Sequence, residues 1–282
     1  MISPVSRAAW LRRRELLFRR FRQTMAIPAM LTSYRRELRQ LTEDRLNLRN
    51  FEWRGFSQNC EDGIIAEIFC RIGTKSRYCV EFGIESGIET CTRWLIEREG
   101  WSGLWIEGSP RDAAAARQRA LKFGVAVKQE FITAENIQQI FRTVGVPVDL
   151  DLLVIDIDGN DYWVWQALRD YAPRVVVIEY NGSFKPPADW VMPYRPDHTW
   201  NLSDHYGASL VALTRLAHEK GYSLVGCDSC GVNAFFVRRD ELAGKFSHVG
   251  DVSRHYIRPK ALFFSHWRRL FGHVVRGPAV GE

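Results

Sequence analysis

The residues with the clearest chemical potential form a turn, Glu81-Phe-Gly83-Ile-Glu-Ser-Gly87, at the end of a short apolar run. A strand that turns sharply into the next segment needs residues without a Cβ where the backbone passes close to a ligand. Gly83 and Gly87 meet that need. Glu81 stands where an acid can contact a positively charged or amino-bearing group. We therefore expect Glu81, Gly83 and Gly87 to bind a cofactor.

A second acid, Glu107, ends the next apolar run and lies 20 residues after Gly87. In Rossmann-type sites an acid at about this distance from the glycine turn accepts hydrogen bonds from both hydroxyls of a ribose. A carboxylate suits this role because its two oxygens match a vicinal diol. The turn and Glu107 together predict a site for an adenosine group.

More oxygen-bearing side chains follow two later apolar runs: Asp156 and Asp158 follow the first, and Glu179 and Asn181 follow the second. Open α/β sheets bind ligands at the carboxyl ends of such strands, so we also place Asp156 at the cofactor site. Asp156, Glu179 and Asn181 offer the oxygen ligands that Mg²⁺ prefers. The favoured alternative is a hydrogen-bonded polar rim that faces the cofactor and an acceptor. We interpret Asp161 as the cap of the helix that follows.

A hydroxyl that reacts as a nucleophile needs a group that removes or polarises its proton. Three side chains are candidates for this catalytic role: Asp158 on the acidic rim, and His198 and His205 in the loop before a late helix. Aromatic side chains of the same loop either form a lid that stacks on a sugar or aromatic ligand or pack over the sheet edge. They are Tyr180, Phe184, Trp190, Tyr194 and Trp200.

Short apolar runs alternate with amphipathic segments through the middle of the chain, which predicts a parallel sheet with helices on both faces. The predicted strands are 78–82, 104–107, 125–128, 152–157, 175–180, 223–226 and 233–237, and the predicted helices are 89–99, 111–122, 134–144, 161–171 and 208–220. The last two strands are joined by only a turn, which forces antiparallel pairing. We predict an α/β, Rossmann-like, mostly parallel sheet that ends in an antiparallel hairpin.

These motifs resemble those of the FkbM-like branch of class I S-adenosylmethionine-dependent methyltransferases. The resemblance rests on Glu-Phe-Gly-x-x-x-Gly, Gly-Leu-Trp-Ile-Glu-Gly and Ile-Asp-Ile-Asp-Gly-Asn-Asp-Tyr-Trp, with supporting segments at 57–63, 206–210 and 231–236. It covers about residues 56 to 240. It implies a seven-stranded sheet, S-adenosylmethionine as cofactor, and most often methylation of a hydroxyl on a glycan or small natural product. Glu81, Gly83 and Gly87 would line the methionine and adenosine turn, and Glu107 would hold the ribose. Glu85 departs from the pattern, because the family usually has a glycine there.

The charge of the chain is unevenly distributed. Residues 1–50 carry a net +8 and residues 251–282 a net +4, whereas residues 51–250 carry −6. A nucleic-acid enzyme usually carries its positive field around its cleft, so we expect no nucleic-acid partner. The sequence predicts an Arg-rich helical extension over 1–50, a methyltransferase domain over 51–245 and a basic tail over 246–282. The extension either touches an anionic membrane surface peripherally or covers the domain edge.

The sequence has neither an export signal nor an apolar stretch of the roughly 18 residues that a spanning helix requires, so we expect a cytoplasmic protein, membrane-associated only if the extension binds lipid. Two other functions stay open. A nicotinamide-dependent dehydrogenase shares the glycine turn and the ribose acid, but Glu85 occupies its middle glycine position. A non-catalytic adaptor on the same fold would dock on membranes through the basic ends.

Overall fold

The computed structural model describes residues 44–200 and 203–259. The chain divides into two units after Arg45, and almost every described residue belongs to the second. Residues 1–43 of the predicted Arg-rich extension and 260–282 of the predicted basic tail lie outside the described residues, whereas residues 44–50 are described and Leu48 is buried. Residues 246–259 are described, and Phe246 packs into the core with 6% of its surface exposed. Within the described part, no helix combines the length and the apolar character needed to cross a membrane.

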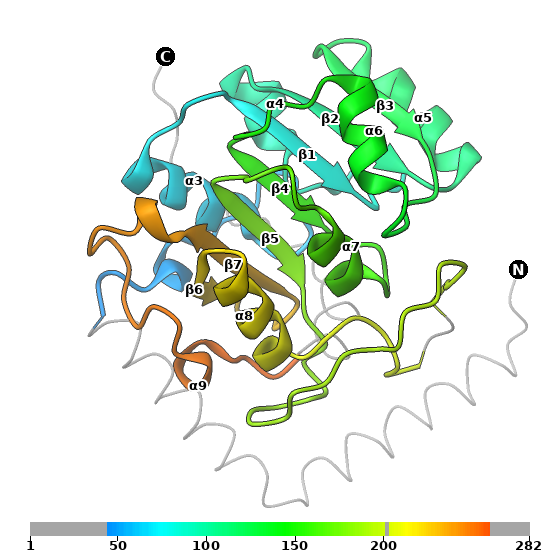
Figure 1. Cartoon of the computed structure of the whole chain (residues 1–282). Helices are drawn as coiled ribbons and strands as arrows, with labels where there is room; N and C mark the ends of the chain where they lie inside the picture. The colour runs from blue at the N-terminus through cyan, green and yellow to red at the C-terminus, as the bar shows by residue number, and fades with distance from the viewer. Residues whose placement is uncertain (1–43, 201–202, 260–282) are drawn as a thin grey trace, which may run out of the picture. The chain divides into compact units, whose positions relative to one another are not determined.

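Seven strands form one sheet in the order β3-β2-β1-β4-β5-β7-β6 (Figure 1). Strands β1 to β5 pair in parallel, and β7 lies antiparallel between β5 and β6. The predicted fold class is therefore confirmed, including the closing hairpin. The strands are β1 (Tyr78–Phe82), β2 (Ser102–Glu107), β3 (Val125–Gln129), β4 (Leu152–Ile155), β5 (Val175–Glu179), β6 (Tyr222–Cys227) and β7 (Asn233–Arg238).

Helices cover both faces of the sheet, as predicted (Figure 1). Successive residues of a strand point to opposite faces, so Val80 and Phe82 pack in one core cluster and Cys79 in the other. The first cluster contains side chains of α6 (Ile137–Val144), α7 (Asp161–Ala167) and α8 (Leu210–Glu219); the second contains side chains of α3 (Glu61–Ile72), α4 (Arg93–Glu99) and α5 (Pro110–Ala120). A short helix, α9 (Val252–His255), follows the hairpin.

The five predicted helices are present with ends that shift by up to four residues, and one long helix was not predicted. The helix expected from residue 89 begins at Arg93, because residues 83–92 form a loop that the Glu81 carboxylate holds. The helix α3 was not predicted, although it is 12 residues long and most of its side chains are buried. Its polar start, Glu61-Asp62-Gly63, is buried too, which hides the usual contrast between an apolar and a polar face.

The strand order reverses between β1 and β4, which lie side by side at the centre of the sheet. From β1 the chain runs outward through β2 to β3, and from β4 it runs in the other direction to β5. Loops that leave the carboxyl ends of β1 and β4 therefore diverge, and such a switch point opens a crevice for a ligand.

Candidate functional site

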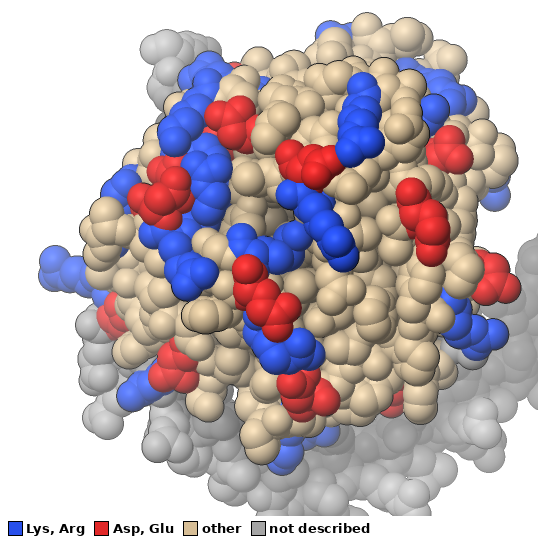
Figure 2. All heavy atoms as spheres, in the orientation of Figure 1, with Lys and Arg blue, Asp and Glu red and all other residues tan. Residues whose placement is uncertain are grey.

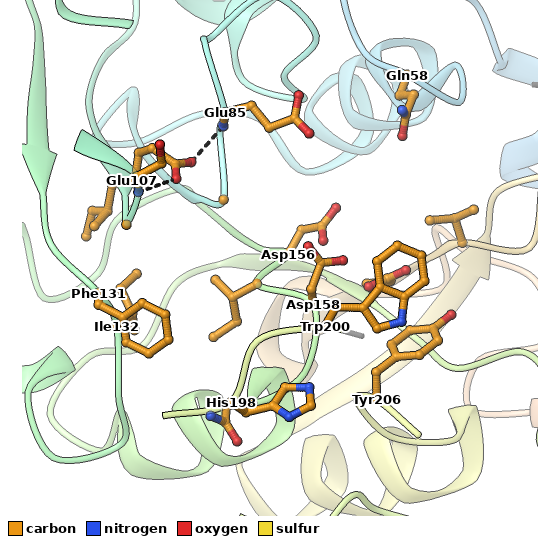
Figure 3. A pocket seen from close by; sticks show the side chains of 18 of the residues that line it. Gln58, Glu85, Glu107, Phe131, Ile132, Asp156, Asp158, His198, Trp200 and Tyr206 are labelled. Atoms are coloured by element: carbon orange, nitrogen blue, oxygen red, sulfur yellow. Dashed lines mark hydrogen bonds between the residues drawn. The ribbon is translucent and has the colours of Figure 1, made fainter. Parts of the chain in front are cut away.

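A cavity of about 990 Å³ lies at this crevice. Each of the four central parallel strands contributes a lining residue at or just after its carboxyl end: Gly83, Glu107, Asp156 and Glu179. The opposite wall comes from His198, Trp200, Asp204 and Tyr206 and from the turn before β7. In Figure 3, Asp156 and Asp158 lie between Glu107 and Glu85 on one side and Trp200 and Tyr206 on the other. The strands thus bring residues far apart in the sequence to one rim.

Gly83 lies in the left-handed backbone region, with φ of 65°. A Cβ added at Gly83 would come within 1.7 Å of the carbonyl oxygen of Asp156. The position therefore requires glycine, as the sequence indicated, but the close approach is to the backbone that follows β4. Because Gly83 has no Cβ, the backbone that follows β1 can pass close to the backbone that follows β4 before the two loops diverge.

Glu81 does not line the cavity. It is 5% exposed, and its carboxylate accepts hydrogen bonds from the backbone N–H of Cys91 and of Thr92 and from the Thr92 hydroxyl, at 2.6 to 2.9 Å. Burial raises the pKa of this carboxyl to about 7. Gly87 also lies outside the lining. Of the predicted cofactor residues, Gly83, Glu107 and Asp156 line the cavity, whereas Glu81 supports the loop above it.

Glu107 lines the cavity and organises two loops at once. Its Oε2 accepts a hydrogen bond from the backbone N–H of Glu85 at 2.8 Å, and its Oε1 accepts one from the N–H of Ser109, also at 2.8 Å (Figure 3). A carboxylate offers about four acceptor sites, so both oxygens keep a site for a further donor. The side chain is thereby held at the cavity wall, with acceptor capacity left on both oxygens, as binding of a vicinal diol would require.

Glu85 stands where the resemblance led us to expect a glycine, and its φ is 48°. That left-handed conformation strains a residue with a Cβ and explains why glycine suits the position. Glu85 lines the cavity; in Figure 3 its backbone nitrogen lies beside Glu107, and its side chain extends away from Glu107. Partial burial, and next the charges of Asp112 and Glu107, raise the pKa of the Glu85 carboxyl.

Three carboxylates converge at the centre of the rim. Asp156, Asp158 and Glu179 each offer an oxygen, and these oxygens all lie within 4.8 Å of one another. Burial raises the pKa of Asp156 and of Glu179 well above the ordinary values, and neighbouring carboxylates add to both shifts. The pKa of Asp158 is also raised by burial, while the nearby His198 opposes the shift.

Asn181, predicted to join Asp156 and Glu179 as a metal ligand, is fully buried and occupied by its own loop. Its Nδ2 donates to the carbonyl oxygens of Asp204 and Tyr206, and its Oδ1 accepts from the N–H of Ser183. These bonds position the loop that carries the opposite wall. Asp158 lies beside Asp156 and Glu179, whereas Asn181 is not among the residues that line the cavity.

Asp161 holds the loop before α7 instead of capping the helix. Its Oδ1 accepts from the N–H of Ile157 and its Oδ2 from the N–H of Gly159, both at 2.9 Å. Asn160 is the N-cap residue, without a side-chain capping bond. Since Asp161 is the first residue of the helix, its side chain reaches back to the amides of the segment that carries Asp158. Burial raises the pKa of Asp161 to about 6.

Only one of the two candidate histidines lines the cavity. His198 lines the cavity, and its ring packs on Gly159, where an added Cβ would come within 2.2 Å of the ring. Its Nε2 is buried and has no hydrogen-bond partner among the described residues. His205 is exposed and outside the lining, where its ring meets that of Trp190 edge-on. The geometry therefore favours His198 over His205 as a group that could reach a bound ligand.

Some aromatic residues of the loop line the cavity, and others contact only other parts of the protein. Trp200 lines the cavity with 46% of its surface exposed, and its ring contacts that of Tyr206 at 6.0 Å between centroids. Phe184 and Trp190 stack on each other at 4.1 Å and do not line it. Tyr180 and Tyr194 are also outside the lining, and each donates its hydroxyl proton to another part of the chain. Only part of the predicted lid therefore faces the cavity.

Several lining residues were not predicted from the sequence: Gln58, Ile106, Phe131, Ile132, Asn160 and Tyr206. Gln58 and Tyr206 lie inside the segments that carry the family resemblance, which could have singled them out. Phe131 and Ile132 follow β3 and carry no polar signal. Asn160 is 3% exposed; its Nδ2 donates to the carbonyl of Arg195, while its Oδ1 has no partner among the described residues.

The described lining of the cavity is strongly acidic. It contains eight carboxylates, no Lys or Arg, and His198 as its one histidine. By contrast, Figure 2 shows basic and acidic side chains interspersed on one face of the molecule. Because a cleft focuses the field of its walls, this cavity favours ligands that carry positive charge.

No family model and no curated protein match the chain. Several solved structures are similar to it at low sequence identity. The N-terminal domain of EvdMO1 with SAH bound is 15% identical, with 65% of this chain and 82% of that chain covered and a TM-score of 0.44. An S-adenosylmethionine-dependent methyltransferase from Clostridium acetobutylicum is 9% identical, with 64% and 92% covered and a TM-score of 0.43.

A third similar structure is the plantazolicin methyltransferase BamL in complex with a triazolic desmethylPZN analog and SAH. It is 16% identical, with 67% of this chain and 69% of that chain covered and a TM-score of 0.40. These similar structures are all S-adenosylmethionine-dependent methyltransferases or domains solved with SAH.

Proposed function

We propose that this protein is an S-adenosylmethionine-dependent methyltransferase that methylates a hydroxyl of a glycan or small natural product. The observation that carries the proposal is Glu107, fixed with free acceptor sites at the end of β2 and opening into the cavity at the switch point. Such an acid suits the ribose hydroxyls of an adenosine. Phe131 and Ile132 provide an apolar wall of the same cavity, as the flat face of an adenine requires.

The charge of the cavity agrees with this donor. When bound, S-adenosylmethionine supplies a methyl group on a positively charged sulfur, ready for transfer to a nucleophilic oxygen. The acidic lining would offset that positive charge, and Asp156, which lines the cavity, would accept a hydrogen bond from the donor's amino group. Gly83 lets the backbone of the β1 loop come close at this point.

The opposite half of the cavity offers what a hydroxyl acceptor needs. Trp200 and Tyr206 present aromatic surface on which a sugar ring can stack. Asn160 Oδ1 can accept a hydrogen bond from a hydroxyl, since its amide is fixed by the carbonyl of Arg195. His198 Nε2, which has no other described partner, can take the proton of the reacting hydroxyl while the charge of Asp158 stabilises the protonated ring.

Isothermal titration calorimetry of the full chain with S-adenosylmethionine, SAH and NAD tests the donor. We expect the two sulfur nucleosides to bind and NAD to bind weakly or not at all, because Glu85 fills the middle glycine position that a dinucleotide turn uses. Binding of NAD without binding of SAH would replace the proposal with that of a dehydrogenase. Binding of none of the three would favour a non-catalytic protein.

A further inference from the structure

The loop that follows β4 passes directly against the ring of His198. A Cβ added at Gly159 would lie 2.2 Å from His198 Cδ2, 2.8 Å from Nε2 and 3.3 Å from Cγ, so its three nearest atoms all belong to one imidazole. Non-bonded carbon atoms pack at about 3.5–4.0 Å, so no side chain fits at this position while the ring stays in place. We propose that Gly159 is a positioning residue whose missing side chain provides the seat for the imidazole of His198. Its catalytic meaning rests on the proposed function, in which His198 is the general base.

The backbone does not by itself require glycine at residue 159. Gly159 is not among the residues with a positive φ, whereas Gly83 and Gly207 have φ values of 65° and 58°. An alanine could therefore adopt this backbone without the strain that a left-handed conformation imposes. At Gly83 the obstacle to a side chain is a backbone carbonyl, but at Gly159 it is the ring of His198. The glycine is thus explained by a histidine that lies far away in the sequence.

Hydrogen bonds hold the backbone of Gly159 on both sides. Its N–H donates to Asp161 Oδ2 at 2.9 Å, and its carbonyl oxygen accepts from the N–H of Gly207 at 3.0 Å. Asp161 and Gly207 are both buried, so a shift of the loop would leave polar groups without partners in the interior, which is unfavourable. A methyl group at residue 159 would therefore displace the ring and not the loop.

One carbonyl group ties the histidine to the same loop. The carbonyl oxygen of Arg195 accepts a hydrogen bond from Asn160 Nδ2 at 2.7 Å and another from the backbone N–H of His198 at 2.9 Å. The backbone of His198 is thus held beside the residue that follows Gly159. Rotation of the imidazole out of its seat is then the way in which a clash at residue 159 would be relieved.

Displacement of the ring would affect the atom that the proposed mechanism uses. The ring edge nearest Gly159 carries Nε2, which has no hydrogen-bond partner among the described residues. A shift of about 1 Å in a reacting group can cost about 100-fold in rate, because the group no longer lies in line with its partner. Glu107 belongs to β2, a different strand, so we expect binding of the methyl donor to be retained.

The test is a cycle of three variants of the full chain: Gly159→Ala, His198→Ala and the double variant. The assay is SAH release from S-adenosylmethionine with a glycan or polyol acceptor. Gly159→Ala should lower the wild-type kcat by about tenfold or more. In the His198→Ala protein, where the ring is gone, the same substitution should change kcat by less than about twofold. SAH affinity, measured by calorimetry, should stay within about twofold of the wild type in all three variants.

Thermal unfolding provides a readout that needs no activity. Gly159→Ala should lower the melting temperature of the wild type but not that of His198→Ala, because the added methyl group then meets no ring. Gly182→Ala is the matched control, since Gly182 also lacks a positive φ and its Cβ would come within 2.3 Å of Pro259. The loss of melting temperature in Gly182→Ala should be the same with and without the His198 ring.

The proposal is overturned if Gly159→Ala keeps the wild-type kcat, or if it lowers the melting temperature of His198→Ala as much as that of the wild type. The second result would mean that the loop itself requires glycine. The same comparison covers a Gly159→Ala chain that fails to fold, because the double variant should then fold. Failure of the proposed function would be seen separately, as absence of SAH binding or as full activity of His198→Ala.

Discussion

The carboxylate of Glu107 holds the backbone of Glu85: the amide nitrogen of Glu85 lies 2.8 Å from Glu107 Oε2. This bond links the loop after β1 to the end of β2, so the residue proposed to bind the ribose also shapes the glycine turn that faces the donor. The turn is strained at Glu85, whose φ is 48°. Substitutions at these two positions should therefore have different effects on affinity and on stability.

Replacement of Glu107 should reduce donor affinity. Glu107→Ala removes both acceptors for the diol and is expected to cost about 1–3 kcal/mol of SAH binding, which calorimetry can measure. Glu107→Gln keeps one acceptor oxygen and should lose less. Glu130→Gln serves as the control, because Glu130 is another acid of the same cavity. Unchanged SAH affinity in Glu107→Ala would remove Glu107 from the donor site.

Replacement of Glu85 by glycine should stabilise the fold. Glycine adopts positive φ without steric cost, so Glu85→Gly is expected to raise the free energy of unfolding by about 0.5–1 kcal/mol in urea titrations. The amide that donates to Glu107 is retained. We expect SAH affinity to change little, since the backbone contact survives. A large loss of affinity without loss of stability would show that the Glu85 side chain itself binds the donor.

The stability of the protein should depend on the ionisation of Glu81. Burial raises its pKa from 4.5 to about 7. Because the folded-state pKa lies above the unfolded one, the stabilising contribution is complete below about pH 4.5 and is lost as the pH rises through about 7. A shift of this size corresponds to a loss on the order of 3 kcal/mol.

Glu81→Gln tests this dependence, because glutamine has a similar size and is neutral at every pH. Urea unfolding between about pH 5 and pH 8 should show a steeper fall of the unfolding free energy in the wild type than in the variant. The comparison cancels the contributions of the other titrating groups. Parallel curves for the two proteins would contradict the prediction. Thr92→Val should raise the pKa of Glu81 further, because the Thr92 hydroxyl donates a hydrogen bond to the carboxylate and lowers that pKa.

The two histidines should differ in catalysis. Loss of a general base costs about 10²–10⁴-fold in rate, so His198→Ala should lower kcat by that range, measured as SAH released with a glycan or polyol acceptor. His205→Ala is the matched control and should remain near the wild type, because His205 lies outside the cavity. SAH affinity should be the same in both variants. Equal activity of His198→Ala and the wild type would show that His198 is not the general base.

Much of the fold could be predicted from the sequence, because the spacing of apolar residues and the turn residues determine the strands locally. The run from Tyr78 to Phe82 is a strand with the predicted bounds, and the remaining strands shift by one or two residues at their ends. Gly83 was predicted from the need for a residue without a Cβ, and the carbonyl of Asp156 supplies the reason. Helix α3 was missed because the burial of its polar first turn depends on the elements that surround it.

The sequence by itself determined which carboxylates end the strands, because the period of apolar residues marks where each strand stops. Only the tertiary structure decided what each carboxylate contacts. The Glu81 carboxylate accepts a hydrogen bond from Thr92, whereas Glu107 lines the cavity, although both residues lie at the carboxyl ends of parallel strands. Asp158 joins Glu179, and Asn181 binds the backbone of Asp204. These choices depend on loops that meet across the switch point, and such long-range contacts leave no periodic pattern in the chain.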